Sequence, residues 1–325
     1  MHETALRAVF STARFRCEEK VIIMGSTKSS VHGWRTAGAR LAALIIMVQA
    51  LGLRTGLSQE IAPPRLDEQF SKQEKIYRSR GADRPAGYVI GRGLSDYAEL
   101  LPSGFCDELG RLDSSDRWLD IGAGAGQAIM DYYVPEDAAA QAEKCGRFGA
   151  KARAVAMSIE DRRTDKWRQL AATLGDERIR YLTGKRLRHY SLEELGTFQI
   201  ITDVFGGFSY TENLSRFVDQ VLRLLAVGGA FYTLVPGVHL EHGKNKLGIL
   251  YLTELEDAAG RPLKVCSWLK QSACAKVTCE SKSDWKRPTE LITMRKTCSD
   301  VSIPRLKLWE FEAGYPPTRR FQVDP

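Results

Sequence analysis

The sequence predicts an α/β fold in which helices flank a mostly parallel sheet. Residues 117–133 read as a buried strand, a tight loop with glycine at every second position, and a helix. Residues 198–237 add a second buried strand, a helix with apolar residues at helical spacing, and a third strand. Strands and helices that alternate in this way are typical of a parallel sheet, whose ligands bind at the carboxyl ends of the strands.

The loop in the first of these stretches holds three glycines, Gly122, Gly124 and Gly126. Glycine lets the backbone approach a ligand closely, and the start of the following helix offers unpaired N–H groups. The spacing is not G-x-G-x-x-G, because the sixth position is Gln127, and no lysine follows the last glycine as in phosphate-binding loops. A nicotinamide-dependent oxidoreductase is therefore disfavoured.

The pattern D-x-G-x-G-x-G, which begins at Asp120 after an apolar strand, resembles the first motif of the class I S-adenosylmethionine-dependent methyltransferases. In that family the glycine loop passes under the amino-acid part of the cofactor. The stretch from Phe198 to Gly237 looks like the last two parallel strands of the family, the first of them ending at Asp203. The resemblance covers about residues 88–237 and implies a Rossmann-like sheet with an antiparallel C-terminal edge.

The resemblance also implies the candidate site. The cofactor-binding set is Asp120, Gly122, Gly124, Gly126, Glu160 and Asp203. Glu160 is the candidate for the ribose hydroxyls because Ser158, at the aligned position, would accept two hydroxyl donors less well. The candidate catalytic residues are Asp203 and Tyr210, at or after a strand end on the expected ligand side. Methyl transfer itself asks mainly for alignment in a shielded site.

Other residues near the expected site are weaker candidates. The segment before the first strand, which often folds over the cofactor in related enzymes, carries Tyr88, Arg92 and Tyr97. The loop expected to face adenine carries Lys185 and Arg186, where many relatives have an acid. Two histidines, His239 and His242, follow the last parallel strand and could serve as a base if the acceptor needs one.

The acceptor is expected to be a small molecule rather than nucleic acid. The run at 203–206 is D-V-F-G and not the N-P-P-Y or D-P-P-Y tetrad of amino-directed nucleic-acid methyltransferases. The net charge of +7 comes from scattered lysines and arginines without the aromatic interleaving of a nucleic-acid platform. The sequence does not indicate an oligomeric state.

Residues 1–62 read as a leader and linker that precede a domain at 63–325. From Met24 a basic region leads into the apolar run Leu41–Leu53, and Gly56-Leu57-Ser58 offers a small-x-small cleavage site. This layout is typical of a secretory signal peptide, and the apolar run is short for a membrane span. Export or membrane tethering is expected; an amphipathic helix in a cytoplasmic protein is the alternative. Because S-adenosylmethionine is made in the cytosol, an exported enzyme would need a supply.

The cysteines fit an oxidising compartment. Of the seven, Cys17 lies in the leader, and four of the remaining six fall between Cys266 and Cys298, in an elaboration at about 262–300. An even count suits disulfides. A metal site is disfavoured because no C-x-x-C occurs, and buried thiols are the remaining alternative.

The elements outside the resemblance are predicted from periodicity alone. They are helices at 67–81 and around Leu100 to Leu109, and strands at 249–255, 262–269, 289–296 and 306–311. Together the features predict an S-adenosylmethionine-dependent methyltransferase with an unidentified acceptor. A non-catalytic exported binding or scaffold protein on the same fold is the alternative hypothesis.

Overall fold

The computed structural model describes residues 66–78, 90–146, 149–211, 213–235, 254–282, 289–314 and 317–323. The chain divides into two compact units, Met1–Ile61 and Ala62–Pro325, and every described residue lies in the second. The expected leader therefore lies outside the described residues, as do Tyr88, His239 and His242. Within the described ranges, no helix is long and apolar enough to cross a membrane.

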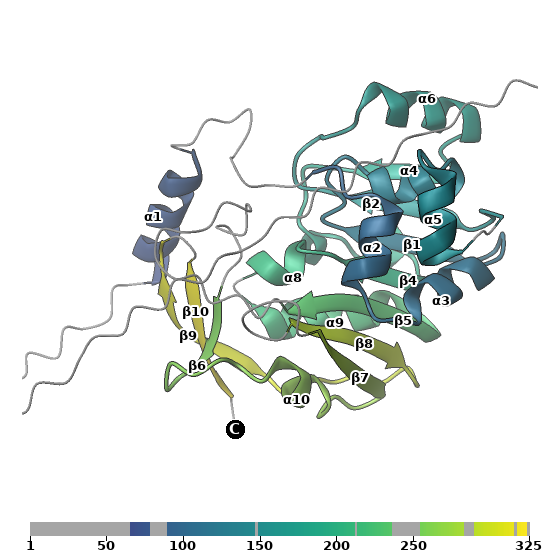
Figure 1. Cartoon of the computed structure of the whole chain (residues 1–325). Helices are drawn as coiled ribbons and strands as arrows, with labels where there is room; N and C mark the ends of the chain where they lie inside the picture. Colours follow the sequence, from purple (N-terminus) through teal and green to yellow (C-terminus); the bar gives the residue numbers. More distant parts are fainter. Residues whose placement is uncertain are drawn as a thin grey trace, which may run out of the picture. The chain divides into compact units, whose positions relative to one another are not determined.

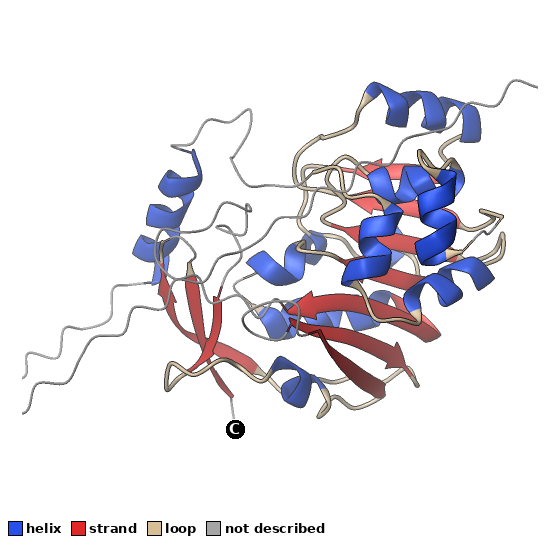
Figure 2. Ribbon diagram, in the orientation of Figure 1, coloured by secondary structure: helices blue, strands red, loops and turns tan. Residues whose placement is uncertain are grey.

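A seven-stranded sheet with helices on both faces forms the centre of the fold (Figure 1, Figure 2). Its strands are β1 (Arg117–Ile121), β2 (Arg153–Met157), β3 (Ile179–Leu182), β4 (Phe198–Asp203), β5 (Leu225–Val235), β7 (Ala275–Lys282) and β8 (Thr289–Lys296). The strand order is β3-β2-β1-β4-β5-β8-β7. β1 to β5 pair in parallel, whereas β8 is antiparallel to both β5 and β7. The predicted fold class is confirmed, including its antiparallel C-terminal edge.

Two buried clusters divide the core, one on each face of the sheet. The first face is covered by α2 (Leu94–Leu100), α3 (Phe105–Arg111), α4 (Gln127–Tyr133), α5 (Ala138–Cys145) and α6 (Asp165–Leu174). The second face is covered by the 3₁₀ turn η1 (Leu187–His189), α7 (Leu192–Leu195), α8 (Gly207–Tyr210), α9 (Leu214–Leu224) and α10 (Val265–Leu269). Side chains alternate along β1, so Trp118 lies in the first cluster and Leu119 in the second.

Several predicted elements agree with the structure, and some need correction. The helix at 165–174 and the strand at 289–296 have the predicted bounds. The helix predicted around Leu100 to Leu109 is instead two helices, because Leu101 takes the extended conformation favoured before Pro102. The strand predicted at 262–269 is wrong, since Val265–Leu269 forms α10 with four buried residues. A short apolar run does not distinguish a strand from a helix.

A separate three-stranded sheet follows in the C-terminal region. It consists of β6 (Glu254–Asp257), β9 (Leu306–Glu312) and β10 (Thr318–Val323) in the order β6-β10-β9. Arg320 links the three strands, because its guanidinium pairs with Glu256 at 2.7 Å and with Glu310 at 2.6 Å. Helix α1 (Leu66–Arg78) packs on β9, where the rings of Phe70 and Phe311 lie 4.5 Å apart.

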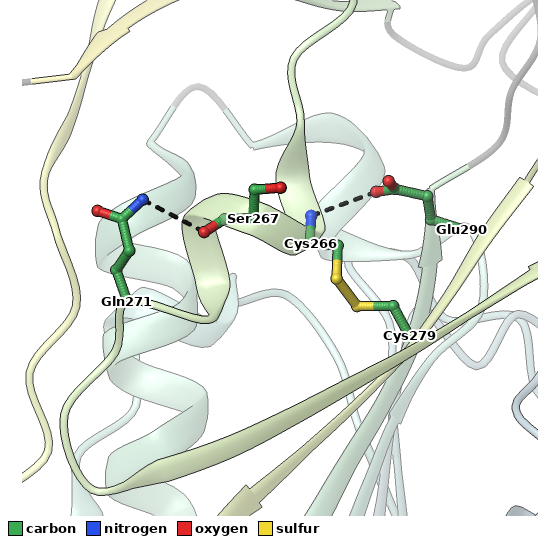
Figure 3. The surroundings of a disulfide bond; sticks show 5 residues. All are labelled: Cys266, Ser267, Gln271, Cys279 and Glu290. Atoms are coloured by element: carbon green, nitrogen blue, oxygen red, sulfur yellow. Dashed lines mark hydrogen bonds between the residues drawn. A yellow bond between two sulfur atoms is a disulfide. The ribbon is translucent and has the colours of Figure 1, made fainter.

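Three disulfides pair all six cysteines of the described residues. They are Cys106–Cys145, Cys266–Cys279 and Cys274–Cys298, with Cα–Cα distances of 5.1, 6.4 and 5.0 Å. The first joins α3 to α5, and the second joins α10 to β7. Figure 3 shows the second disulfide, beside which the Cys266 amide donates to the Glu290 carboxylate at 3.2 Å. The structure thus pairs these cysteines as the disulfides that their even count favours.

Candidate functional site

The glycine loop leaves β1 at its carboxyl end, beside the ends of β2 and β4. Its glycines all have positive φ, which is 77° for Gly122, 56° for Gly124 and 77° for Gly126. The amides of Gly122 and Ala123 donate to the Met157 carbonyl at the end of β2, at 2.8 and 3.1 Å. A Cβ on Gly122 would overlap with the backbone of Gly206, after β4. Only glycine therefore allows these two loops to touch.

The segment before α2 lies against the glycine loop. The Ala125 amide donates to the Ile90 carbonyl at 2.6 Å, and a Cβ on Gly124 would overlap with that carbonyl. The buried Asp131 of α4 accepts the Leu94 amide at 2.9 Å and so fixes the end of the segment. The candidate Arg92 is consequently held next to the glycine loop.

Two aromatic residues hold the loop from the side of β3. A Cβ on Gly126 would overlap with the indole of Trp167, which is buried at the start of α6. The Trp167 ring meets the Tyr181 ring edge-on, with centroids 5.1 Å apart. The Tyr181 hydroxyl donates to the Gly124 carbonyl. Trp167 and Tyr181 together thus support two of the three glycines of the loop.

Asp120 lies behind the loop and is fully buried. Both of its carboxylate oxygens accept the Tyr97 hydroxyl, at 3.0 and 2.9 Å. The Thr202 hydroxyl donates to Asp120 at 2.8 Å and accepts from Trp118 Nε1 at 2.9 Å. Burial raises the pKa of Asp120 to about 7, against the opposing effect of these hydrogen bonds. Asp120 and Tyr97 use their polar atoms on each other, so their direct contact with a cofactor stays a prediction.

Asp203 is also fully buried and caps the start of α8. Its carboxylate accepts the amides of Gly206 and Phe208, both at 2.9 Å. Burial raises the pKa of Asp203 to about 7, the backbone hydrogen bonds lower it, and the nearby Asp120 raises it. In this geometry Asp203 orders the loop after β4, and its catalytic and cofactor-binding roles stay predictions.

The loop after β4 brings Phe205 and Tyr210 close to Arg92. The Arg92 guanidinium lies over the Phe205 ring, 4.7 Å from its centroid. Phe205 has a φ of 55°, a left-handed conformation that costs a bulky residue about 1–2 kcal/mol. Burial lowers the pKa of Arg92, and the neighbouring Tyr97 and Tyr210 oppose that shift. A cation and a strained aromatic residue therefore lie together at the carboxyl ends of β1 and β4, and the charge of Arg92 is influenced by Tyr210.

Glu160 stands beyond the end of β2 and faces solvent. Its side chain is 61% exposed and pairs with Arg162. The next residue, Asp161, pairs with Arg163 at 2.6 Å, and the hydrogen bonds from Arg163 lower the pKa of Asp161 to about 2. The structure does not bring Glu160 into contact with the glycine loop, and its predicted role at the ribose is untested.

The basic loop after β3 has a counter-charge. Lys185 pairs with Glu194 of α7 at 3.1 Å, and its ammonium lies 5.2 Å from the centre of the Tyr190 ring.

Among the described residues, no group of three or more His, Cys, Asp and Glu side chains could hold a metal ion. A cavity of about 380 Å³ lies between α6 and β3, and its wall includes Trp167 and Tyr181. These two residues adjoin the glycine loop, although the cavity itself runs along the edge strand.

Three residues that shape the site were not predicted from the sequence: Trp167, Tyr181 and Thr202. Thr202 stands directly opposite Asp120 in the register of β1 and β4. Threonine is an ordinary strand residue, so its position in β4 gave no signal of this contact. Trp167 and Tyr181 gave no local signal, since each also fits an ordinary core position.

No protein-family model matches the chain, and no curated protein matches its sequence. Among solved structures, it is similar to the N-methyltransferase NodS from Bradyrhizobium japonicum in complex with S-adenosyl-L-homocysteine, at 13% identity and a TM-score of 0.39, over 69% of this chain and 98% of that chain. It is similar to a putative O-methyltransferase from Klebsiella pneumoniae at 14% identity and a TM-score of 0.37, over 71% of this chain and 99% of that chain. It is also similar to an rRNA methylase from Streptococcus thermophilus at 14% identity and a TM-score of 0.36, over 65% of this chain and 100% of that chain.

The assignment of the fold rests on the molecule itself. The parallel strands β3-β2-β1-β4-β5 are followed by an antiparallel β8 that separates β5 from β7, and a D-x-G-x-G-x-G loop leaves the central strand β1. The antiparallel C-terminal edge is the one implied by the resemblance that the sequence carries. The observed topology is therefore the Rossmann-like one that the resemblance to the class I S-adenosylmethionine-dependent methyltransferases implies.

Proposed function

We propose that the chain binds S-adenosylmethionine at the glycine loop and transfers its methyl group to an acceptor. The observation that carries the proposal is the set of three left-handed glycines directly after β1. Each glycine stands where a Cβ would overlap with another part of the chain. Such a loop fits a ligand held by backbone groups, as the amino-acid part of the cofactor requires.

The chain's own residues supply positioning rather than covalent chemistry. When bound, S-adenosylmethionine supplies a methyl group on a sulfonium. The glycine loop would hold the amino-acid part, with Asp120 fixing the loop from behind through its bonds to Tyr97 and Thr202. Arg92 and Tyr210 would face the acceptor side. An in-line displacement gains most from such alignment and from exclusion of water.

The acceptor is proposed to be a small molecule. The loop after β4 supports this choice, because Asp203 is occupied by the amides of Gly206 and Phe208 and Phe205 lies under Arg92. This arrangement differs from that of the N-P-P-Y or D-P-P-Y tetrad, which presents a polar side chain and an aromatic ring to a nucleobase. A partly buried cation also suits an acceptor that carries a negative charge.

We also propose that the protein functions in an oxidising compartment. Three disulfides among the described residues support it, because structural disulfides persist where thiols are oxidised. The signal-like segment before residue 59 supports the same expectation. The enzyme would then depend on cofactor that is released from or carried out of the cytosol.

Calorimetric titration of the oxidised full-length chain with S-adenosylmethionine and S-adenosylhomocysteine tests the proposal. We expect micromolar binding that Gly124→Ala abolishes, because its Cβ would displace Ile90. Gly91→Ala is the matched control, since a Cβ there has open space around it in the same segment. Absence of binding by the wild-type chain would overturn the methyltransferase proposal. Binding without methyl transfer to any of a panel of small molecules would favour the non-catalytic alternative.

A further inference from the structure

Helix α8 follows the loop after β4, whose Gly206 lies against Gly122 of the glycine loop. It has four residues, begins at Gly207 after the loop of β4, and ends at Tyr210 (Figure 1). A helix this short has no stability of its own, because nucleation costs more than its few hydrogen bonds return. Its position is therefore set by contacts with the rest of the chain: Phe208 is buried against the Phe217 ring, and both ends of the helix are hydrogen-bonded to buried side chains.

A buried charged residue lies at each end of α8. Asp203 accepts two amides at the amino end, as described above. At the carboxyl end, Arg319 donates through Nη2 to the Ser209 carbonyl at 3.0 Å and to the Phe208 carbonyl at 3.5 Å, and through Nη1 to the Thr211 carbonyl. A carboxyl group that accepts amides at the start and a cation that donates to carbonyls at the end are the partners that helix ends favour.

Arg319 comes from β10 in the separate three-stranded sheet, more than 100 residues along the chain from α8. It is 1% exposed, which is exceptional for an arginine. Buried guanidinium groups are costly unless their N–H groups are bonded, and the carbonyls at a helix end are acceptors without intrahelical partners. The contact thus gives Nη1 and Nη2 of Arg319 acceptors at the end of α8 and ties the C-terminal sheet to the helix.

The position of α8 affects the glycine loop directly. Gly206 precedes the helix, and a Cβ there would overlap with the Ile121 carbonyl and lie 3.1 Å from the Gly122 Cα. A shift of α8 would therefore move Gly206 against the first glycine of the loop. The same shift would move Tyr210 relative to Arg92 on the acceptor side.

We propose that Arg319 is a positioning residue of the site: it holds α8, and through Gly206 the glycine loop, in the geometry that binds the cofactor. The C-terminal sheet is on this account a part of the site rather than an appendage. The predicted change in ligand affinity rests on the proposed function. The predicted change in hydrogen exchange rests only on the contacts between Arg319 and α8.

Calorimetric titration of the full-length chain with S-adenosylhomocysteine tests the inference, using Arg319→Gln, Arg319→Lys and Arg320→Gln. Arg320→Gln is the matched control, because it breaks ion pairs within the same sheet and leaves the contacts to α8 intact. We expect Kd to rise at least tenfold for Arg319→Gln, about threefold for Arg319→Lys, and not at all for Arg320→Gln. A merely structural Arg319 would lower the unfolding midpoint of both Gln variants and leave the Kd of the folded molecules unchanged, which would overturn the inference.

Hydrogen exchange gives a second measurement that does not need ligand. Without ligand, we expect the amides of Gly206 and Phe208 to exchange about tenfold faster in Arg319→Lys than in the wild-type chain, with β4 unchanged. Equal exchange would overturn the inference even if Arg319→Gln does not fold. A wild-type chain that does not bind S-adenosylhomocysteine, yet shows the faster exchange in the variant, would remove the proposed function and leave α8 braced by Arg319.

Discussion

The glycine-loop region, residues 90–133 with β4, and the C-terminal region, residues 254–323, are held together in different ways. In the first, backbone segments touch at glycines, and Tyr97, Asp120 and Thr202 form a closed buried network. In the second, two disulfides hold α10 and the segments around the strands β7 and β8, and the ion pairs of Arg320 join β6, β9 and β10. The first region is thus held by close backbone approach and a buried network, and the second by covalent and ionic cross-links.

The largest effect is expected for Gly126→Val, which tests the close packing of the first region. Valine at a φ of 77° is strained, and its side chain would displace the buried Trp167. Strain and overpacking together predict a loss of roughly 4 kcal/mol in the free energy of unfolding. Urea denaturation measures it. Gly104→Ala, which has open space and ordinary φ, should change the value by less than about 0.5 kcal/mol.

A smaller effect is expected when one cross-link of the second region is removed. The Cys266–Cys279 disulfide closes a short loop of 13 residues. The chain-entropy argument predicts that Cys266→Ser with Cys279→Ser lowers the free energy of unfolding by about 3 kcal/mol. Binding of S-adenosylhomocysteine should remain. If the double variant lost S-adenosylhomocysteine binding and kept its unfolding midpoint, the disulfide would serve the binding site and not stability, which would contradict this prediction.

Thr202→Val tests the buried network. The variant keeps the shape of the side chain but leaves Trp118 Nε1 and one oxygen of Asp120 without this partner. We expect a loss of about 2 kcal/mol in the free energy of unfolding. Thr278→Val, at an exposed position on β7, is the control from the second region and should be close to neutral. Equal changes in the free energy of unfolding for the two substitutions would show that the buried network does not contribute to stability.

The pH dependence of stability should have opposite signs in the two regions. The pKa of Asp120 is raised to about 7 by burial, so the folded state retains a proton that the unfolded state releases near pH 4. Its contribution therefore becomes less favourable as the pH rises from about 4 to about 7. The pKa of Asp257 is lowered by hydrogen bonds from Arg261, so its contribution is lost as the pH falls.

Urea denaturation of Asp120→Asn and Asp257→Asn between pH 3 and pH 8 measures these contributions. Relative to the wild-type chain, Asp120→Asn should gain stability as the pH rises, and Asp257→Asn should lose it. The Asp257 effect is the smallest predicted here, because that carboxylate is exposed to solvent screening. A parallel pH dependence of Asp120→Asn and the wild-type chain would contradict the burial argument.

Elements that depend on local patterns could be predicted from the sequence in both regions, and contacts between distant residues could not. The glycine loop, α6 and β8 depend on local patterns, and each was predicted at its observed place. The partners of Asp120 lie 23 and 82 residues away, so no spacing within the chain displays them. β10 was missed because Arg319 stands at a buried position of the strand. β7 was missed although Ala275, Val277 and Cys279 alternate with polar residues along it. The contact of Arg319 with α8 depends on how two sheets pack, which periodicity does not encode.

Hydrogen exchange of the oxidised full-length chain, with and without S-adenosylhomocysteine, tests the central claim most directly. Because the ligand is expected on the glycine loop, the peptide that spans residues 122–133 should exchange more slowly when it is present. Peptides from β7 and β9 should not change. Protection confined to the C-terminal region, or no protection anywhere at saturating ligand, would contradict a cofactor site at the glycine loop.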